Sequence, residues 1–260
     1  MADEEVLTGG GVNHVVRVGD TVRRPAGAWT PAVHALLGHL EARGFDGAPR
    51  CHGIDAEGRE ILDFVPGDVP SYPLPEWTLT DEALVAVGAL LREYHDATVG
   101  FPIHRDFSWY LPPVAPAEVI CHGDAATYNC VFREGLPVAF IDFDTAHPGP
   151  RVWDVSYAAY RFVALSDPRH EGVGSWPVEE QARRLRVFAD AYGLGDADRH
   201  ALVSTARARL DHLIRLMYDQ AAAGNEAFAS HIARGDDRFY RTDMAHLARH
   251  EATFRSALTA

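Results

Sequence analysis

The chain has 260 residues, 47% of them apolar and 23% charged, the composition of a globular protein long enough to bury one large core or two modest ones. Its formal net charge is −13 and all 24 of its basic residues are arginines, so we expect no nucleic-acid partner, because an acidic surface repels phosphate backbones. No stretch approaches the roughly 20 apolar residues of a membrane-spanning helix, and the N-terminus is acidic where a signal peptide is basic, so we expect a cytoplasmic protein with no membrane partner.

The first part of the chain is predicted to hold short strands and one helix. Residues 6–25 read as a glycine-punctuated strand pair with a two-residue hairpin turn at residues 19–20. A helix is expected to begin at Thr30, which would be its N-cap, with Pro31 in the first turn, and to end near Gly44. Its apolar residues recur at helical spacing, as an amphipathic helix requires.

A boundary between two lobes is expected shortly after this helix. Two more short strands are predicted around residues 50–54 and 60–65. Proline and glycine then cluster in residues 65–70, which is typical of a connector. The boundary therefore separates a small lobe of residues 1–66 from a larger lobe of residues 67–260.

The larger lobe is predicted to be mainly helical. Residues 80–97 have the apolar spacing of an amphipathic helix, whereas residues 118–142 read as strand and loop. Further helices are expected at residues 154–165, 178–192, 197–222 and 237–257. The order of the elements predicts an α+β fold: a small antiparallel-sheet lobe with one helix, followed by a larger helical lobe with an inserted hairpin.

Residues able to carry chemistry gather around that hairpin. Its two apolar strands flank a turn at residues 133–137, and antiparallel pairing would place Asn129 opposite Asp142 on one face. Amide and carboxylate oxygens are the hard ligands that Mg²⁺ uses when phosphate oxygens complete its octahedron. A loop with His122 and Asp124 comes just before, so Asp124 would lie beside this metal and could orient and deprotonate an attacking hydroxyl.

The pattern His122-Gly-Asp124-x-x-x-x-Asn129, followed by Ile-Asp142-Phe-Asp144, resembles the catalytic loop and metal-binding signature of aminoglycoside phosphotransferases. These are relatives of choline kinases and, more distantly, of protein kinases. The resemblance implies a two-lobed, protein-kinase-like fold that moves the γ-phosphoryl group of ATP or GTP to a hydroxyl of a small molecule, such as an amino sugar or another cationic metabolite. It also implies that Asp124 is the catalytic base, that Asn129 and Asp142 hold Mg²⁺, and that His122 supports the loop.

The resemblance extends beyond the hairpin. Trp153-Asp154 matches a later element of the family whose aspartate braces the catalytic loop, so Asp154 is expected to support the site. Residues 1–66 would be the nucleotide-binding lobe, and residues 67–260 the catalytic and substrate-binding lobe. Asp144 is open to two interpretations, a helper beside the metal or a solvated turn residue.

The sequence departs from the kinase pattern at the phosphate-binding cation. Kinase-like folds place a lysine on the third strand and pair it with a glutamate from the first helix, but this chain has no lysine. Arg23 is the expected phosphate ligand, and Arg24, on the opposite face of the hairpin, is the alternative. The helix offers only Glu41 near its far end, with Val33 or His34 at the glutamate's level, which predicts that the usual ion pair is missing.

Two other functions compete with the kinase interpretation. A missing ion pair would suit a kinase-like protein that holds nucleotide with little or no transfer. The pairs His122-x-Asp124 and Asp142-x-Asp144, with His147, could instead indicate a metal-dependent phosphoesterase. The position of the asparagine and the lack of a further histidine cluster argue against the phosphoesterase.

Overall fold

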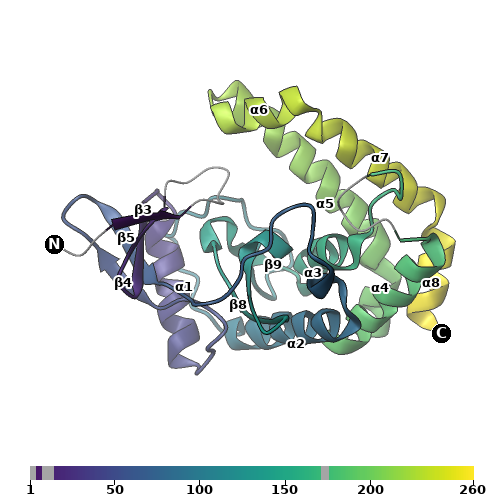
Figure 1. Ribbon diagram of the computed structural model, residues 1–260, viewed down its shortest axis with the longest axis horizontal. Coiled ribbons are helices and arrows are strands. Elements are labelled where there is room, and N and C mark those ends of the chain that lie inside the picture. The colour runs from purple at the N-terminus through teal and green to yellow at the C-terminus, as the bar shows by residue number, and fades with distance from the viewer. Residues whose placement is uncertain (1–3, 8–14, 171–175) are drawn as a thin grey trace. The chain divides into compact units, whose positions relative to one another are not determined.

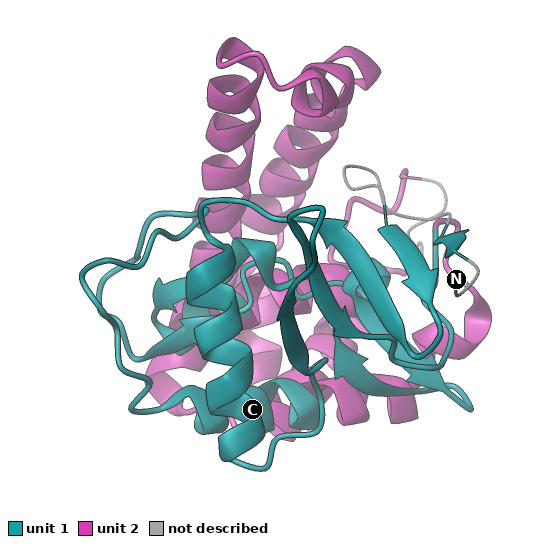
Figure 2. Cartoon of the chain, turned by 90° about the vertical axis from the view of Figure 1, so that its left-hand side faces the viewer, with its two compact units in different colours: residues 1–71, 89–154 teal, residues 72–88, 155–260 magenta. Residues whose placement is uncertain are grey.

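A computed structural model describes residues 4–7, 15–170 and 176–260; the glycine run at residues 9–11 lies outside them. The chain divides into two compact units, one of residues 1–71 and 89–154 and one of residues 72–88 and 155–260 (Figure 2). The expected boundary after residue 66 stays a prediction.

The first unit contains an antiparallel sheet with the strand order β1-β2-β3-β5-β4 among the described residues. Figure 1 labels its strands β3, β5 and β4. Its strands are β1 (Glu4–Leu7), β2 (Val15–Val18), β3 (Thr21–Pro25), β4 (Cys51–Ile54) and β5 (Arg59–Asp63). Gly19 turns the β2–β3 hairpin with φ +62°, in the left-handed region that glycine favours. The register pairs Val16 with Arg23 and Arg24 with Glu60, so Arg24 and Glu60 point to one face and Arg23 to the other.

Helix α1 (Thr30–Ala42) follows the third strand. It buries an apolar stripe made of Ala32, Val33, Leu36, Leu37 and Leu40. The expected N-cap was wrong by one residue: Trp29 occupies the cap position, and the Thr30 hydroxyl instead accepts a hydrogen bond from the Gly27 N–H at 2.8 Å. Pro31 lies in the first turn of the helix, where backbone N–H groups have no acceptor within the helix, so the missing N–H of proline loses no hydrogen bond.

The first unit also contains two short pairs of antiparallel strands. β6 (Val119–Cys121) pairs with β9 (His147–Gly149), and β7 (Cys130–Arg133) with β8 (Leu136–Phe140). The later part of α2 (Asp81–Thr98) contributes the fully buried Tyr94, whose ring lies 5.7 Å from that of Phe143 and 6.3 Å from that of His122, centre to centre. These aromatic contacts pack the loop after β6 onto α2.

The second unit is mainly helical. Its helices are α4 (Val178–Tyr192), α5 (Asp196–Ala222), α6 (Glu226–Arg234), α7 (Asp236–Arg249) and α8 (Glu251–Thr259). The expected helix at 237–257 is broken at His250, whose φ of −107° and ψ of 13° lie outside the helical region. α3 (Arg151–Ala159) continues into a π-helical turn at Tyr160–Ala164. The predicted α+β class, with a strand-rich part followed by helices, is confirmed.

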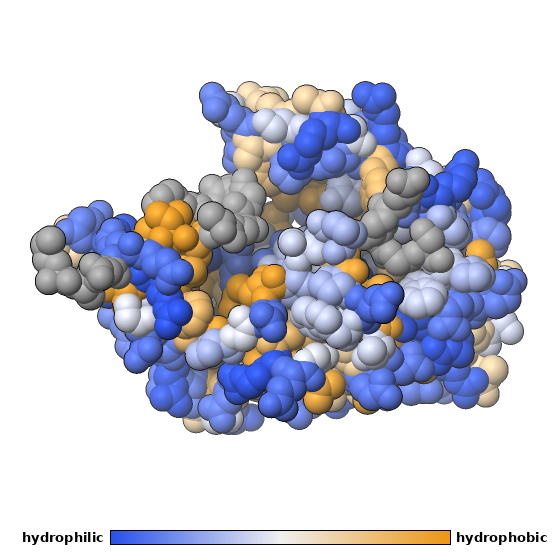
Figure 3. All heavy atoms as spheres, viewed as in Figure 1, coloured by the Kyte–Doolittle hydropathy of each residue, from blue (hydrophilic) through white to orange (hydrophobic). Residues whose placement is uncertain are grey.

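The described residues contain no helix with the length and apolar character needed to cross a membrane. Hydrophilic residues cover much of the face in Figure 3, with apolar residues in smaller patches between them.

Candidate active site

Asp154 is a buried residue that holds the loop after β6 through two hydrogen bonds from the backbone. Its Oδ2 accepts the His122 N–H at 2.7 Å, and its Oδ1 accepts the Gly123 N–H at 2.9 Å. The His95 ring lies 3.1 Å from Oδ2. Burial alone would raise the pKa of Asp154, but its hydrogen bonds with His95 and with the His122 N–H hold this pKa well below its usual range, so the carboxylate stays ionised. Asp154 therefore lies where a residue that braces the loop is expected to lie.

The backbone of this loop also depends on a close approach at Gly123. Its φ is +83°, and a Cβ there would lie 2.2 Å from the Thr145 carbonyl oxygen. Only glycine combines that dihedral with that contact without displacing backbone. Gly123 was not among the residues expected to matter for the site, although it is the middle residue of the motif that identified the loop.

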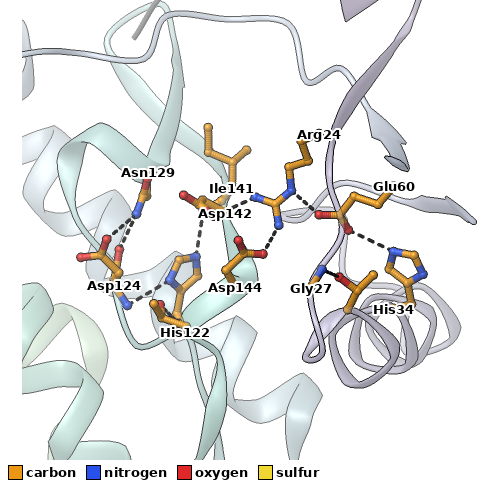
Figure 4. A network of polar contacts seen from close by, with 12 residues as sticks. Arg24, Gly27, His34, Glu60, His122, Asp124, Asn129, Ile141, Asp142 and Asp144 are labelled. Atoms are coloured by element: carbon orange, nitrogen blue, oxygen red, sulfur yellow. Dashed lines mark hydrogen bonds and ion pairs between the residues drawn. The ribbon is translucent and has the colours of Figure 1, made fainter. Parts of the chain in front are cut away.

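His122 joins the loop to the hairpin. Its Nε2 lies 3.0 Å from the Ile141 carbonyl oxygen, and its Nδ1 accepts the Asp124 N–H at 3.3 Å (Figure 4). These two bonds require the neutral ring with its proton on Nε2. Burial lowers the pKa of His122, which agrees with that neutral form. The side chain therefore fixes the spacing between Asp124 and the residue that precedes Asp142.

Asp124 is held by two neighbours in the short turn that follows it. Its Oδ2 accepts from Asn129 Nδ2 at 2.8 Å, and its Oδ1 accepts from the Tyr128 hydroxyl at 2.8 Å. Asn129 Nδ2 also donates to the Asp124 carbonyl at 3.1 Å, so the carbonyl end of that amide faces away from Asp124 (Figure 4). Tyr128 was missed by the sequence reasoning; its position four residues after Asp124 was the available signal.

Asp142 lies in the same network, but not by the expected pairing. Cys130 pairs with Phe140, and the Ile141 N–H donates to the Asn129 carbonyl at 2.9 Å, so Ile141 rather than Asp142 lies opposite Asn129. The predicted register was wrong by one residue. Asp142 has a left-handed backbone, with φ +63°, which ends the strand alternation and turns its carboxylate back toward the cluster (Figure 4).

Arg24 supplies the cation of this cluster. Its Nη1 donates to Asp142 Oδ1 at 2.7 Å, its Nη2 donates to Asp144, and its Nε donates to Glu60 (Figure 4). The Arg24 side chain is only 6% exposed. Burial alone would lower the pKa of its guanidinium, but the three carboxylates raise that pKa above its ordinary value. A buried, permanently charged fork thus stands where kinase-like folds place lysine.

Arg23, the expected phosphate ligand, is not brought into this cluster. Its Nη1 donates to the Thr21 hydroxyl at 2.7 Å, and its Nε lies 3.8 Å from an Asp55 carboxylate oxygen. The alternation along β3 was predicted correctly: Arg24, the alternative, faces Asp142, and Arg23 lies on the opposite face.

The expected lack of a helix glutamate at this cation agrees with the structure, in which Glu41 of the helix pairs with Arg50, but another carboxylate takes that place. The carboxylate partner of the cation is Glu60, which comes from β5 instead of from the first helix. Helix α1 contributes His34, at the level expected for the glutamate, and its Nε2 lies 3.0 Å from Glu60 Oε2. The sequence reasoning missed Glu60 because only the pairing of β3 with β5 brings it opposite Arg24.

Asp144 is not a solvated turn residue. Its side chain is 15% exposed, is paired with Arg24, and has a hydrogen bond with the Trp29 side chain. Burial raises the pKa of Asp144 to about 6, against the lowering effect of Arg24. Of the two interpretations left open, the structure favours a role within the cluster.

The residues expected to hold magnesium have suitable chemistry for it. Because Asn129 Nδ2 is committed to Asp124, the amide oxygen is the atom that remains for a cation. Asp142 gives one oxygen to Arg24, and its side chain is 42% exposed. An amide oxygen and a partly exposed carboxylate are hard ligands of the kind that Mg²⁺ takes alongside phosphate oxygens. Within the described ranges, no group of three or more His, Cys, Asp or Glu residues could hold a metal, as the phosphoesterase interpretation would need.

Comparison with known proteins agrees with this geometry. The sequence pattern of the phosphotransferase enzyme family matches residues 102–203. The trifolitoxin immunity protein of Rhizobium leguminosarum bv. trifolii is 37% identical over 237 residues, which cover 87% of this chain and 86% of that protein. The chain belongs to the phosphotransferase enzyme family. This membership confirms the predicted enzyme class.

Solved structures share the fold of this phosphotransferase. A choline/ethanolamine kinase family protein from Mesorhizobium loti superimposes with a TM-score of 0.66 at 19% identity, covering 98% of this chain and 93% of that one. The GDP complex of aminoglycoside 2'-phosphotransferase-IIIa gives a TM-score of 0.63 at 15% identity, covering 94% and 92%. The complex of amicoumacin kinase hAmiN with AMP-PNP, Ca²⁺ and Ami gives 0.63 at 13% identity, covering 88% and 87%. The predicted kinase-like fold is confirmed.

Proposed function

We propose that this phosphotransferase moves the γ-phosphoryl group of ATP or GTP to a hydroxyl group of a small molecule, with Asp124 as the catalytic base. The observation that carries the proposal is that the Asp124–Asn129 contact and the Arg24–Asp142 contact belong to one network, joined through His122 and Ile141 (Figure 4). Phosphoryl transfer demands mainly positioning and charge neutralisation from a protein. A carboxylate, a pair of oxygen ligands and a buried cation in one cluster meet those demands.

Asp124 is suited to orienting the acceptor. Tyr128 and Asn129 each donate to one of its oxygens, which fixes the plane of the carboxylate. An ionised carboxylate has about four acceptor positions, so it can still accept the hydrogen of a substrate hydroxyl. In a loose transition state the alignment of the attacking hydroxyl matters most.

Asn129 and Asp142 would hold the magnesium ion, which when bound neutralises charge on the nucleotide phosphates. We assign the phosphate-binding role to Arg24 in place of Arg23. A guanidinium carries five N–H donors, and Arg24 uses one on each nitrogen for Glu60, Asp142 and Asp144. The second hydrogens of Nη1 and Nη2 are therefore available for phosphate oxygens.

An assay of phosphate transfer tests the proposal. Purified protein is incubated with ATP or GTP and a panel of hydroxylated amines, and phosphorylated product is identified by mass spectrometry. We expect one acceptor class to gain phosphate with the wild-type protein and none with Asp124→Ala. Exposed Asp106 provides the matched control, since Asp106→Ala removes a carboxylate of the same unit outside the network.

The similarity to the trifolitoxin immunity protein favours a second, more specific function, protection of a cell against a toxin. If protection works by phosphorylation, expression of the wild-type chain in a trifolitoxin-sensitive strain should raise the tolerated dose, and Asp124→Ala should not. Equal protection by both proteins would point to toxin binding without transfer. No protection by either would leave a metabolic acceptor as the substrate.

A further inference from the structure

Glu60 is a buried carboxylate whose two oxygens are both committed. The residue is 1% exposed and lies opposite Arg24 in the β3–β5 register. Its Oε1 accepts from Arg24 Nε, and its Oε2 lies 3.0 Å from His34 Nε2 (Figure 4). A buried charge is stable only when it is paired and hydrogen-bonded, and here the partners are the cation of the site on one side and helix α1 on the other.

The contact at Nε determines where the rest of Arg24 points. A guanidinium is planar and rigid, so fixing Nε against Glu60 leaves little freedom for Nη1 and Nη2. Those two nitrogens are the ones directed at Asp142 and Asp144. Glu60 therefore aims the two ends of the fork that face the magnesium ligand, although it does not reach the ligand itself.

His34 fixes Glu60 in turn. It lies on α1, and its side chain is 18% exposed while that of Glu60 is 1% exposed. With Glu60 ionised, His34 donates from Nε2, so Oε2 is held by the helix and Oε1 remains directed at Arg24. Helix, strand β5 and strand β3 are thus joined through three side chains in series.

We propose that Glu60 and His34 are positioning residues that hold Arg24 in place for the phosphates of the nucleotide, so that an arginine, a strand glutamate and a helix histidine do the work of a lysine–glutamate pair. This inference rests on the proposed phosphotransferase function. Lysine at position 24 would not serve equally well, because a single ammonium nitrogen cannot meet Glu60, Asp142 and Asp144 along a fork.

Nucleotide binding separates this positioning role from a merely structural one. Calorimetric titration with magnesium and a non-hydrolysable ATP analogue is compared with titration by adenosine, which has no phosphate. We expect Glu60→Gln to weaken analogue binding by about ten- to hundredfold and His34→Ala to weaken it less, with adenosine binding unchanged in both. Because His34 acts through Glu60, the double variant should bind like Glu60→Gln alone. Arg23→Gln, on the other face of the same strand, is the matched control and should bind like the wild type.

Each outcome decides one of the two claims. A wild-type protein that neither binds the analogue nor transfers phosphate contradicts the proposed function. A wild-type protein that binds normally, with Glu60→Gln binding equally well, overturns the positioning role alone. Equal losses for analogue and adenosine would show that Glu60 serves only the fold. If a thermal melt shows that Glu60→Gln is not folded, the His34→Ala variant provides the test, because His34 is partly exposed. Unchanged affinity of that variant for the analogue overturns the proposal.

Discussion

Asp142 Oδ1 accepts a hydrogen bond from Arg24 Nη1 at 2.7 Å, across 118 residues of chain. The same carboxylate is the expected ligand of magnesium, so one residue would link the proposed phosphate-binding cation to the metal. We expect Asp142→Ala to abolish most of the gain in nucleotide affinity that magnesium provides, at least about tenfold. Affinity measured without magnesium should not fall, because the variant removes a negative charge near the phosphates. Calorimetry with and without the metal checks this.

Loss of magnesium-free affinity in Asp142→Ala would contradict that reasoning, since it would mean that Asp142 supports the fold of the nucleotide site. Full retention of the magnesium effect would show that the metal is held elsewhere.

Asp124→Asn removes the proposed acceptor for the substrate proton while keeping the shape of the side chain. We expect kcat to fall by about 10² to 10⁴, with the nucleotide affinity close to that of the wild type. Steady-state kinetics and a nucleotide titration on the same preparation separate the two effects. A large loss of nucleotide affinity would argue that Asp124 serves the nucleotide site and not the acceptor.

Asp154 is expected to make the stability of the protein depend on pH. The pKa of this carboxyl lies well below its usual range in the folded protein, so the folded state favours the ionised form. Its contribution is therefore complete above the pKa of an unfolded aspartate, about 4, and declines as the pH falls below that value. Asp154→Asn should lower the free energy of unfolding by about 2–4 kcal/mol at pH 7, and the difference from the wild type should narrow in acid. Urea titrations at pH 7 and pH 3 measure both.

A difference between wild type and Asp154→Asn that stays constant or widens in acid would contradict an ionised brace. The loop hydrogen bonds of Asp154 would then be those of a neutral acceptor.

Gly123→Ala and Gly135→Ala form a matched pair, because both glycines have a left-handed backbone, with φ +83° and +79°. A Cβ at Gly135 meets nothing within 4 Å, whereas one at Gly123 lies 2.2 Å from the Thr145 carbonyl oxygen. We expect Gly135→Ala to lower the free energy of unfolding by only about 1–2 kcal/mol and to leave turnover unchanged. Gly123→Ala should lower it further and reduce kcat, because the catalytic loop must shift. Similar behaviour of the two variants would show that the loop tolerates displacement.

The sequence was most informative where the site is local. His122, Asp124 and Asn129 lie within eight residues, so their spacing alone predicted one loop, and the geometry brings them into hydrogen-bonding contact. Asp142 was predicted in the right neighbourhood with the wrong register, because the turn is tighter than expected, with Arg133 opposite Leu136, and a β-bulge lies between Val131 and Phe132. Strand alternation cannot anticipate a bulge.

The periodicity of the sequence could not predict contacts between residues that lie far apart in the chain. Alternation in β3 told Arg23 from Arg24, but only the contact with Asp142 shows which face of the sheet meets the loop. Glu60 enters through a strand pairing between distant segments, and no local pattern marks it. The end of α7 near His250 carries neither glycine nor proline, so nothing in the sequence divided the expected helix there.

Detection of a phosphorylated acceptor is the most direct test of phosphate transfer by this protein. Wild-type protein, magnesium and ATP or GTP are incubated with the acceptor panel, and both modified acceptor and nucleoside diphosphate are quantified. We predict equal amounts of the two products with the wild-type protein and neither with Asp124→Ala. Diphosphate formed with no modified acceptor would contradict transfer to a small molecule, and the same yield from Asp124→Ala would contradict the role of Asp124 as the base.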